Sequence, residues 1–278
     1  MLTFASMEST NHNFSLLFRR LLLLLFIYSF CRVLFLTFNH SYFSNVGIAL
    51  LSRSFFFGLR YDITAIVISN VFFIVLHLLP FRFFYFKTYQ RILLVLFLAV
   101  NIPMILFNCI DFGLYRFTGK RSGAEIFSIM SFGNDFINTL PRMIFDFWYL
   151  LVTFFLLTYI LYRYYPRLVF SESIRVRPSN RFAVSPFGKW MYFILFTALT
   201  FIGFRGGIQY KPLNILSASQ YGIGKTTELV LNTPFTIIKT YGKNKLEDIN
   251  CNSILFRHPI NIFQFIFTIG FNYSERCV

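Results

Sequence analysis

Five long apolar runs, each bounded by charged residues, constrain this chain of 278 residues more than any other feature. A transmembrane helix needs about 20 mostly apolar residues. The runs cover residues 21–38, 63–81, 92–110, 143–162 and 186–204. Charged residues make up 13% of the chain, whereas about 25% is usual for a soluble protein. The sequence therefore predicts an all-α membrane protein with five transmembrane helices, and it excludes a soluble enzyme.

The distribution of basic residues predicts the orientation of these helices. If the N-terminus is cytoplasmic, the inner segments hold more Lys and Arg than the outer loops, chiefly because the inner loop 163–189 is basic. Five crossings then place the C-terminus outside. The net charge of +15 could also suit nucleic acid, but the bases lie between apolar runs and not on one polar face. We therefore expect membrane phospholipid as the anionic partner, and no nucleic acid.

The chain divides into three predicted regions: a five-helix domain at 1–204, an extracytoplasmic linker at 205–248 and an atypical tail at 249–278. In the outer loop, apolar residues between Gly123 and Leu140 recur every three or four positions, which predicts an amphipathic helix. This helix lies either at the outer interface or against the bundle. In the linker, residues 227–231 could form a short helix, which Pro234 would kink or end.

Metal-binding and catalytic patterns are missing from the sequence. The four histidines are scattered, and neither they nor the four cysteines show metal-ligand spacing. No Ser/His/Asp or Cys/His arrangement can be assembled on one side of the membrane. We therefore predict no catalytic residue, no metal site and no cofactor within this chain.

Charged residues gather near the predicted outer helix ends. Arg32 lies inside the first run, where a charge is costly, so it binds a lipid phosphate, pairs with Asp62 or snorkels to the interface. The whole group forms a basic rim with two carboxylates. It either holds an anionic lipid headgroup, because guanidinium pairs with phosphate in a bidentate fork, or braces helix ends through ion pairs. Its members are Arg32, Arg60, Asp62, Asp111, Arg116, Lys120, Arg121 and Arg205.

Several segments together carry a family resemblance. They are Gly58-Leu59-Arg60-Tyr61-Asp62, Asp111 with Gly119-Lys120-Arg121, Arg205-Gly206-Gly207-Ile208-Gln209-Tyr210-Lys211-Pro212 and Leu229-Val230-Leu231-Asn232-Thr233-Pro234-Phe235-Thr236. With five runs and an outer C-terminus, this pattern resembles the membrane part of the lipoteichoic acid synthase family. These enzymes are sulfatase-like phosphoglycerol transferases of the alkaline phosphatase superfamily. The resemblance covers roughly residues 16–248, and its most specific parts begin at Arg205 and Leu231.

The resemblance implies a catalytic domain that this chain does not contain. In the family, the membrane part anchors an extracytoplasmic sulfatase-like α/β domain. There, a Thr nucleophile assisted by Mn or Mg takes phosphoglycerol or a related group from a phospholipid. Only thirty residues follow Asp248, and they lack the Glu-Ser metal-ligand motif, so no catalytic residue can be carried over. The apolar run 260–271 is too short to span a membrane, and we expect a truncation or frameshift after Asp248.

The resulting prediction is a lipid-presenting membrane anchor of a sulfatase-type phosphoglycerol or phosphoethanolamine transferase. It would reside in the bacterial plasma membrane and be inactive without its catalytic domain. The alternative is a non-enzymatic multi-pass membrane protein, either a small transporter or an assembly partner. Transporters commonly have repeated halves and broken helices, whereas here the number of runs is odd and only Asn101 with Pro103 interrupts a run in that way.

Overall fold

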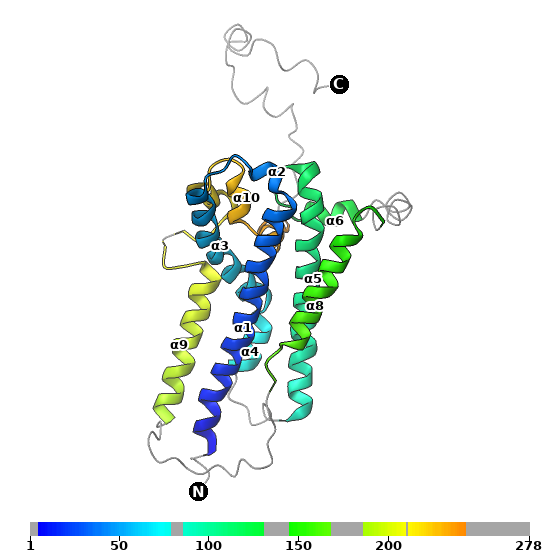
Figure 1. Cartoon of the computed structure of the whole chain (residues 1–278). Helices are drawn as coiled ribbons and strands as arrows, with labels where there is room; N and C mark the ends of the chain where they lie inside the picture. The colour runs from blue at the N-terminus through cyan, green and yellow to red at the C-terminus, as the bar shows by residue number, and fades with distance from the viewer. Residues whose placement is uncertain (1–4, 79–85, 131–144, 168–185, 210, 243–278) are drawn as a thin grey trace, which may run out of the picture. The chain divides into compact units, whose positions relative to one another are not determined.

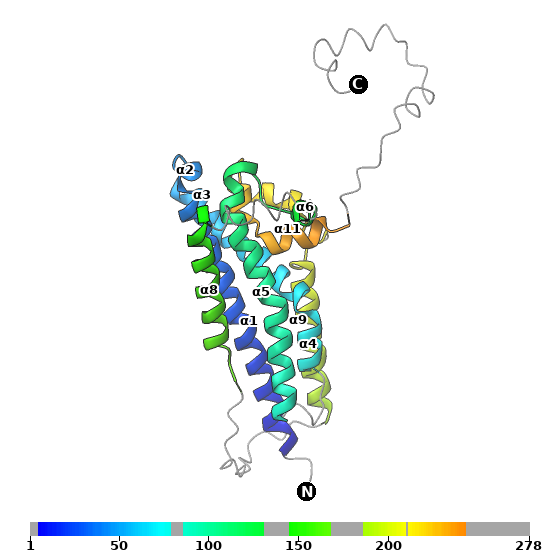
Figure 2. The same ribbon diagram turned by 90° about the vertical axis from the view of Figure 1, so that its right-hand side faces the viewer.

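The computed structural model describes residues 5–78, 86–130, 145–167, 186–209 and 211–242, and the regular structure in these ranges is entirely helical. The chain separates into a unit of residues 1–241 and a second unit of residues 242–278. All described helices belong to the first unit. Its long helices run side by side (Figures 1 and 2). They are α1 (Ala5–Phe38), α3 (Ile48–Ser69), α5 (Lys87–Thr118), α8 (Trp148–Arg163) and α9 (Pro186–Arg205).

Two of these helices are long and apolar enough to cross a membrane. They are the Ser15–Phe38 part of α1 and the whole of α5. Helix α3 passes the same test together with α4 (Val71–Leu78), although the pair is bent by 70°. Helix α8 and the Ile194–Arg205 part of α9 are shorter apolar helices. By length and composition, this is a helical membrane protein with two or three candidate spans.

The predicted span 63–81 falls on two helices, the end of α3 and the whole of α4, with a bend between them. Helix α3 begins earlier, at Ile48, and ends at Ser69, with Asn70 as its C-cap. The Asn70 side chain exchanges two hydrogen bonds with Asn101 of α5, at 3.1 and 2.8 Å. This reciprocal pair satisfies both amides inside the bundle, which makes a break in an apolar run tolerable. Residues 79–81 lie outside the described residues.

The remaining runs differ from the predictions mainly in length. Helix α5 contains the predicted run 92–110 but continues to Thr118, where Gly119 ends it in the left-handed conformation at φ 65°. Helix α1 extends the first run backward to residue 5. Helix α9 covers the predicted run 186–204, and α8 begins at Trp148 within the run 143–162. Of the predicted amphipathic helix at 123–140, only α6 (Glu125–Met130) lies in the described residues.

Residues 211–241, which we call the cap segment, are folded and packed, so the linker predicted at 205–248 is wrong for this part. The cap segment contains η2 (Ile215–Gln220), α10 (Thr226–Val230) and α11 (Thr233–Thr240). Helix α10 contacts α3 and α1, and α11 contacts α5 and α3. Pro234 stands in the first turn of α11 and begins that helix where we expected it to end one, because proline lacks only an N–H that is unused there.

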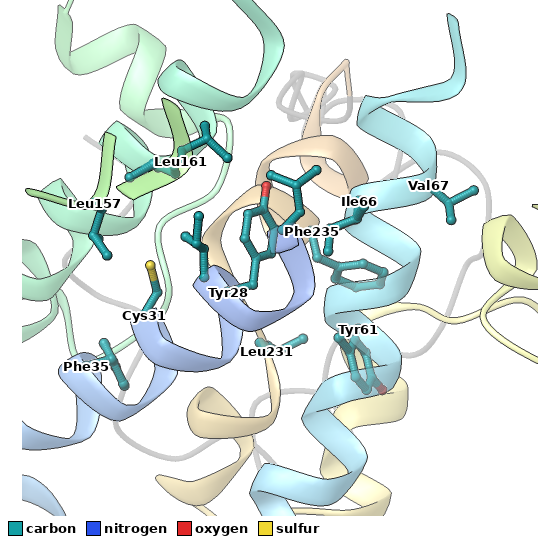
Figure 3. Close-up of a cluster of buried hydrophobic side chains, with 14 of the residues drawn as sticks. Tyr28, Cys31, Phe35, Tyr61, Ile66, Val67, Leu157, Leu161, Leu231 and Phe235 are labelled. Atoms are coloured by element: carbon teal, nitrogen blue, oxygen red, sulfur yellow. The ribbon is translucent and has the colours of Figure 1, made fainter. Parts of the chain in front are cut away.

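Apolar side chains of the cap segment complete the core of the bundle. Leu231 and Phe235 are buried among residues of α1 and α3 (Figure 3). The ring of Phe235 meets that of Tyr61 edge to face, with centroids 5.0 Å apart. Beside Leu231, Leu229 and Val230 are also fully buried. The cap segment is therefore an integral part of the first unit, and helices α2 (His40–Phe43) and α10 lie near the same end of the bundle (Figure 1).

Candidate functional site

Two buried ion pairs lie where the cap segment meets the helices. Arg32 of α1 faces Asp62 of α3 in a bidentate pair, with nitrogen to oxygen distances of 2.7 and 2.8 Å. Arg121, which follows α5, pairs with Asp111 of α5 at 3.0 Å. The four side chains are at most 2% exposed. We call them, together with Ser122, Asn232 and Thr233, the cap cluster.

The guanidinium of Arg32 is turned into the protein. Its Nε donates to the carbonyl of Leu229 at 2.9 Å, and Nη2 donates to the carbonyls of Gly58 at 3.0 Å and Val230 at 3.2 Å. A Cβ at position 58 would collide with the guanidinium of Arg32, so only glycine leaves room for this side chain. Of the three alternatives for Arg32, the contacts show the pairing with Asp62, and they exclude snorkelling because the charged group is buried.

The cap segment supplies polar partners to both carboxylates. Asn232 donates to Oδ1 of Asp62 at 2.6 Å, and its own Oδ1 accepts the backbone N–H of Phe235, which caps the N-terminus of α11. Thr233 donates to Oδ2 of Asp111 at 2.9 Å. Ser122 donates to Oδ1 of Asp111 through its backbone N–H at 2.9 Å and through its hydroxyl at 2.5 Å. The two pairs therefore fasten the cap segment to three helices.

Arg121 holds the cap segment through its backbone as well as its side chain. Its backbone N–H donates to Oε2 of Glu228 at 2.7 Å, and its Nε donates to the Glu228 carbonyl at 2.9 Å. Its guanidinium lies 3.4 Å from the centre of the Phe35 ring. Burial lowers the pKa of Arg121, while the charge of Asp111 acts in the opposite direction. Burial raises the pKa of Glu228, while the hydrogen bond from the Arg121 backbone acts in the opposite direction.

These contacts make the cap cluster a charge-balanced brace. Each cation has its own carboxylate, and both guanidinium groups are buried and bonded internally. A lipid phosphate cannot reach Arg32, Asp62, Asp111 or Arg121 in this conformation. Of the two roles predicted for the basic rim, bracing by ion pairs is thus the one that these four residues perform.

The other four predicted residues lie apart from the cap cluster. Arg60 is half-buried and donates to the carbonyl of Gly206, the hydroxyl of Tyr221 and the side chain of Gln209, at 2.7 to 3.0 Å. Arg205 donates to the carbonyl of the same Gln209 at 3.0 Å. Together they hold the turn that follows α9, where two glycines adopt positive φ. The two exposed cations are Arg116 and Lys120, the latter 3.1 Å from Glu125.

A second buried cluster, which sequence reasoning missed, surrounds Arg20 of α1. Its Nη1 lies 2.6 Å from Nε2 of His77, its Nη2 donates to Oε1 of Gln90 at 2.9 Å, and its Nε donates to the carbonyl of Pro166 at 3.1 Å. The guanidinium also stacks on Tyr165, 4.4 Å from the ring centre. Arginine is a donor only, so Nε2 of His77 accepts. In the sequence, Arg20 was only one of two bases before an apolar run, and these neutral partners carried no recognisable spacing.

Within the described residues, no group of three or more His, Cys, Asp or Glu side chains could hold a metal ion. The thiols of Cys31 and Cys109 are both free and buried. The geometry at the cap end is therefore that of a tertiary brace. Comparisons with protein-family models, with curated proteins and with solved structures found no match.

Proposed function

We propose that this chain is the membrane anchor and lipid-presenting module of a sulfatase-type phosphoglycerol or phosphoethanolamine transferase. One observation supports the proposal above all others: the segments that resemble the lipoteichoic acid synthase family meet in space. Asp62, Asp111 with Arg121, and Asn232 come from three such segments and share the cap cluster. The bond between Asp62 and Asn232 joins residues that are 170 positions apart.

The five-span arrangement belongs to this proposal. Helices α8 and α9 have 16 and 20 residues, about 24 and 30 Å at the usual rise, which approaches the hydrocarbon thickness of about 30 Å. Both present exposed apolar side chains, among them Phe155 on α8 and Leu199 on α9. With α1, the bent pair α3/α4 and α5, they make five crossings. In this arrangement the N-terminus is cytoplasmic and the cap segment faces outward from a bacterial plasma membrane.

The work is divided among the charged residues at the cap end. The cap cluster holds the helices and the cap segment in one arrangement. The headgroup contacts belong to the less buried cations, which are Arg60, Arg116, Lys120 and Arg205. The catalytic Thr and its Mn or Mg belong to a sulfatase-like domain outside this chain. The membrane module would anchor that domain.

Site-directed labelling tests the orientation. We would replace Cys251 and Cys277 by Ser and introduce Ile223→Cys in the cap segment or Tyr164→Cys beyond α8, since both side chains are well exposed. A membrane-impermeant maleimide added to intact cells should label position 223 and leave position 164 unlabelled until the cells are opened. Labelling of position 164 alone from outside would overturn the orientation and, with it, lipid presentation to an outer domain.

Lipid presentation has its own test. The double variant Arg116→Gln/Lys120→Gln should retain less phosphatidylglycerol on purification, measured by native mass spectrometry, whereas Asp146→Asn should retain the normal amount. If the wild type, the double variant and Asp146→Asn retain equal amounts of phosphatidylglycerol, headgroup binding at the cap end is contradicted. Release of glycerol phosphate from phosphatidylglycerol by the purified chain alone would contradict the assignment of catalysis to a separate domain.

The transporter alternative rests on one structural feature. The break between α3 and α4 places Asn70 against Asn101, and Pro103 follows two residues later in α5. Broken helices of this kind form ion and substrate sites in secondary transporters. A flux assay in liposomes separates the two functions, because an anchor should not conduct ions or small solutes.

A further inference from the structure

The Arg20 cluster contains a buried cation that lacks a carboxylate partner. Arg20 is 1% exposed, and its hydrogen-bond partners are an imidazole, an amide and a carbonyl, all neutral. Among the described residues it forms no ion pair. A buried charge is normally neutralised, because removing it from water is costly. Among the residues that the structure describes, this charge is left uncompensated, at the end of the bundle away from the cap cluster.

Four exposed arginines surround this end, and we call them the basic belt. Arg19 adjoins Arg20 in α1, and Arg91 adjoins Gln90 near the start of α5. Arg163 ends α8, and Arg167 follows Pro166. Arg20 bonds Gln90 and Pro166 directly, so the start of α5 and the chain just after α8 meet at Arg20. This is the lower part of the bundle in Figure 1. Within the described part of the chain, no member of the belt pairs with a carboxylate.

The arginine side chains at this end are hydrogen-bond donors. Guanidinium groups cannot accept a hydrogen bond. The hydroxyl of Tyr165 is buried beside Arg20 and has no hydrogen-bond partner among the described residues. A positively charged, donor-rich region fits an anion with several acceptor oxygens, and arginine binds phosphate particularly well.

The surroundings favour a lipid phosphate over a soluble one. Arg163 and Arg167 lie against the rings of Tyr164 and Tyr162, which are 66% and 48% exposed. Exposed tyrosines beside basic residues at helix ends are typical of the membrane–water interface. One turn before Arg163, the exposed Tyr159 continues the apolar surface of α8. The belt thus borders a lipid-facing surface.

We propose that the basic belt, backed by the buried charge of Arg20, binds the phosphates of anionic phospholipids at the end of the bundle opposite the cap segment. This inference is independent of the proposed function, because it concerns the other end of the bundle and needs no catalytic domain. It assigns a lipid-binding role to residues for which the sequence predicted only a topological one.

The test compares three added compounds with the full-length chain in mild detergent. Phosphatidylglycerol should raise the thermal unfolding midpoint and stay bound in native mass spectrometry. Phosphatidylcholine and inorganic phosphate at equal concentration should do neither. If phosphatidylcholine acts as strongly as phosphatidylglycerol, the belt does not select anionic headgroups. If inorganic phosphate acts as strongly, the site takes free phosphate and the lipid assignment is overturned.

Matched variants locate the effect on the protein. The triple variant Arg91→Gln/Arg163→Gln/Arg167→Gln should bind phosphatidylglycerol about tenfold more weakly or worse. The control removes the same charge from exposed positions of the cap end, through Arg53→Gln, Lys211→Gln and Lys225→Gln, and its affinity should stay within about twofold. Equal loss in both triples would show that net charge alone governs binding and would overturn the belt. Loss at Arg116 and Lys120 only would favour the proposed function and defeat this inference.

Discussion

The two ends of the bundle bury arginine in opposite ways. On the same helix α1, Arg20 and Arg32 stand twelve residues apart, roughly 18 Å at the usual rise per residue. Arg32 meets a carboxylate in a bidentate pair, and the second pair beside it leaves the cap cluster neutral. Within the described ranges, the hydrogen-bond partners of Arg20 are all neutral. A balanced pair serves to join segments, whereas an unbalanced cation remains able to attract an anion.

The largest expected effect follows from unbalancing the cap cluster. Asp62→Ala leaves Arg32 buried without its counter-charge, and loss of one member of a buried pair costs about 3 to 5 kcal/mol. Thermal unfolding in mild detergent should show a strongly lowered midpoint. The exposed Asp146 provides the control, since Asp146→Ala should change stability by less than about 0.5 kcal/mol. If Asp62→Ala and Asp146→Ala have similar unfolding midpoints, the cap cluster does not depend on its charge balance, and the contrast between the two ends of the bundle is lost.

A smaller loss is expected at the other end. Arg20→Leu removes the buried charge together with its side chain. Its cost is the loss of the hydrogen bonds to His77, Gln90 and Pro166, which should destabilise the fold by about 1 to 3 kcal/mol. The same unfolding assay should place this variant between wild type and Asp62→Ala. The comparison would break if Arg20→Leu were as damaging as Asp62→Ala, because the charge of Arg20 would then be compensated within the protein.

The tie between the cap segment and the pairs can be weakened without removing a charge. Asn232→Ala loses the N-cap bond to Phe235 and one bond to Asp62, and loss of an N-cap costs about 0.5 to 2 kcal/mol. Asn214→Ala is the matched control, because Asn214 also caps a helix, η2, but is exposed. Protease cleavage within the cap segment should increase for Asn232→Ala more than for Asn214→Ala. The reverse order would show that the cap cluster does not hold the segment.

The smallest expected effect is a pH dependence at the cap end. Because burial raises the pKa of Glu228 above its usual 4.5, the folded protein binds this proton more tightly than the unfolded chain. The resulting stability is fully present below pH 4.5 and is lost as the pH rises through the raised value. Glu228→Gln should remove that dependence of stability on pH. If the unfolding midpoints of the wild type and of Glu228→Gln change with pH in the same way, this prediction is wrong.

The cap segment shows most clearly what sequence reasoning could not reach. The segment is rich in Ser, Gly, Lys and Thr, and its longest run of consecutive apolar residues is only Leu229 to Leu231. No helical or strand period marks them, so composition predicted a linker. They are buried because α1, α3 and α5 leave a place for them, and because Arg32 binds the carbonyls of Leu229 and Val230. The resemblance to family motifs was the only signal that this stretch mattered.

The charged residues were recognised more fully than their partners. The pairing of Arg32 with Asp62 stood among the sequence alternatives, because both lie near the same predicted helix ends. The partners Ser122, Asn232 and Thr233 were missed, since short polar residues are common in any loop. The break at Asn70 was missed as well, because its cause is a contact with Asn101 on another helix.

The sequence by itself determined that this is a helical membrane protein, and it placed α9 to within one residue, whereas α1, α3 and α5 extend well beyond the predicted runs. Partition into lipid depends on the local density of apolar side chains and on the charges that interrupt them, and both can be read along the chain. Only the tertiary structure decided which charges neutralise one another and which remain unbalanced. That choice depends on distances of about 3 Å between side chains far apart in sequence, and no local pattern encodes them.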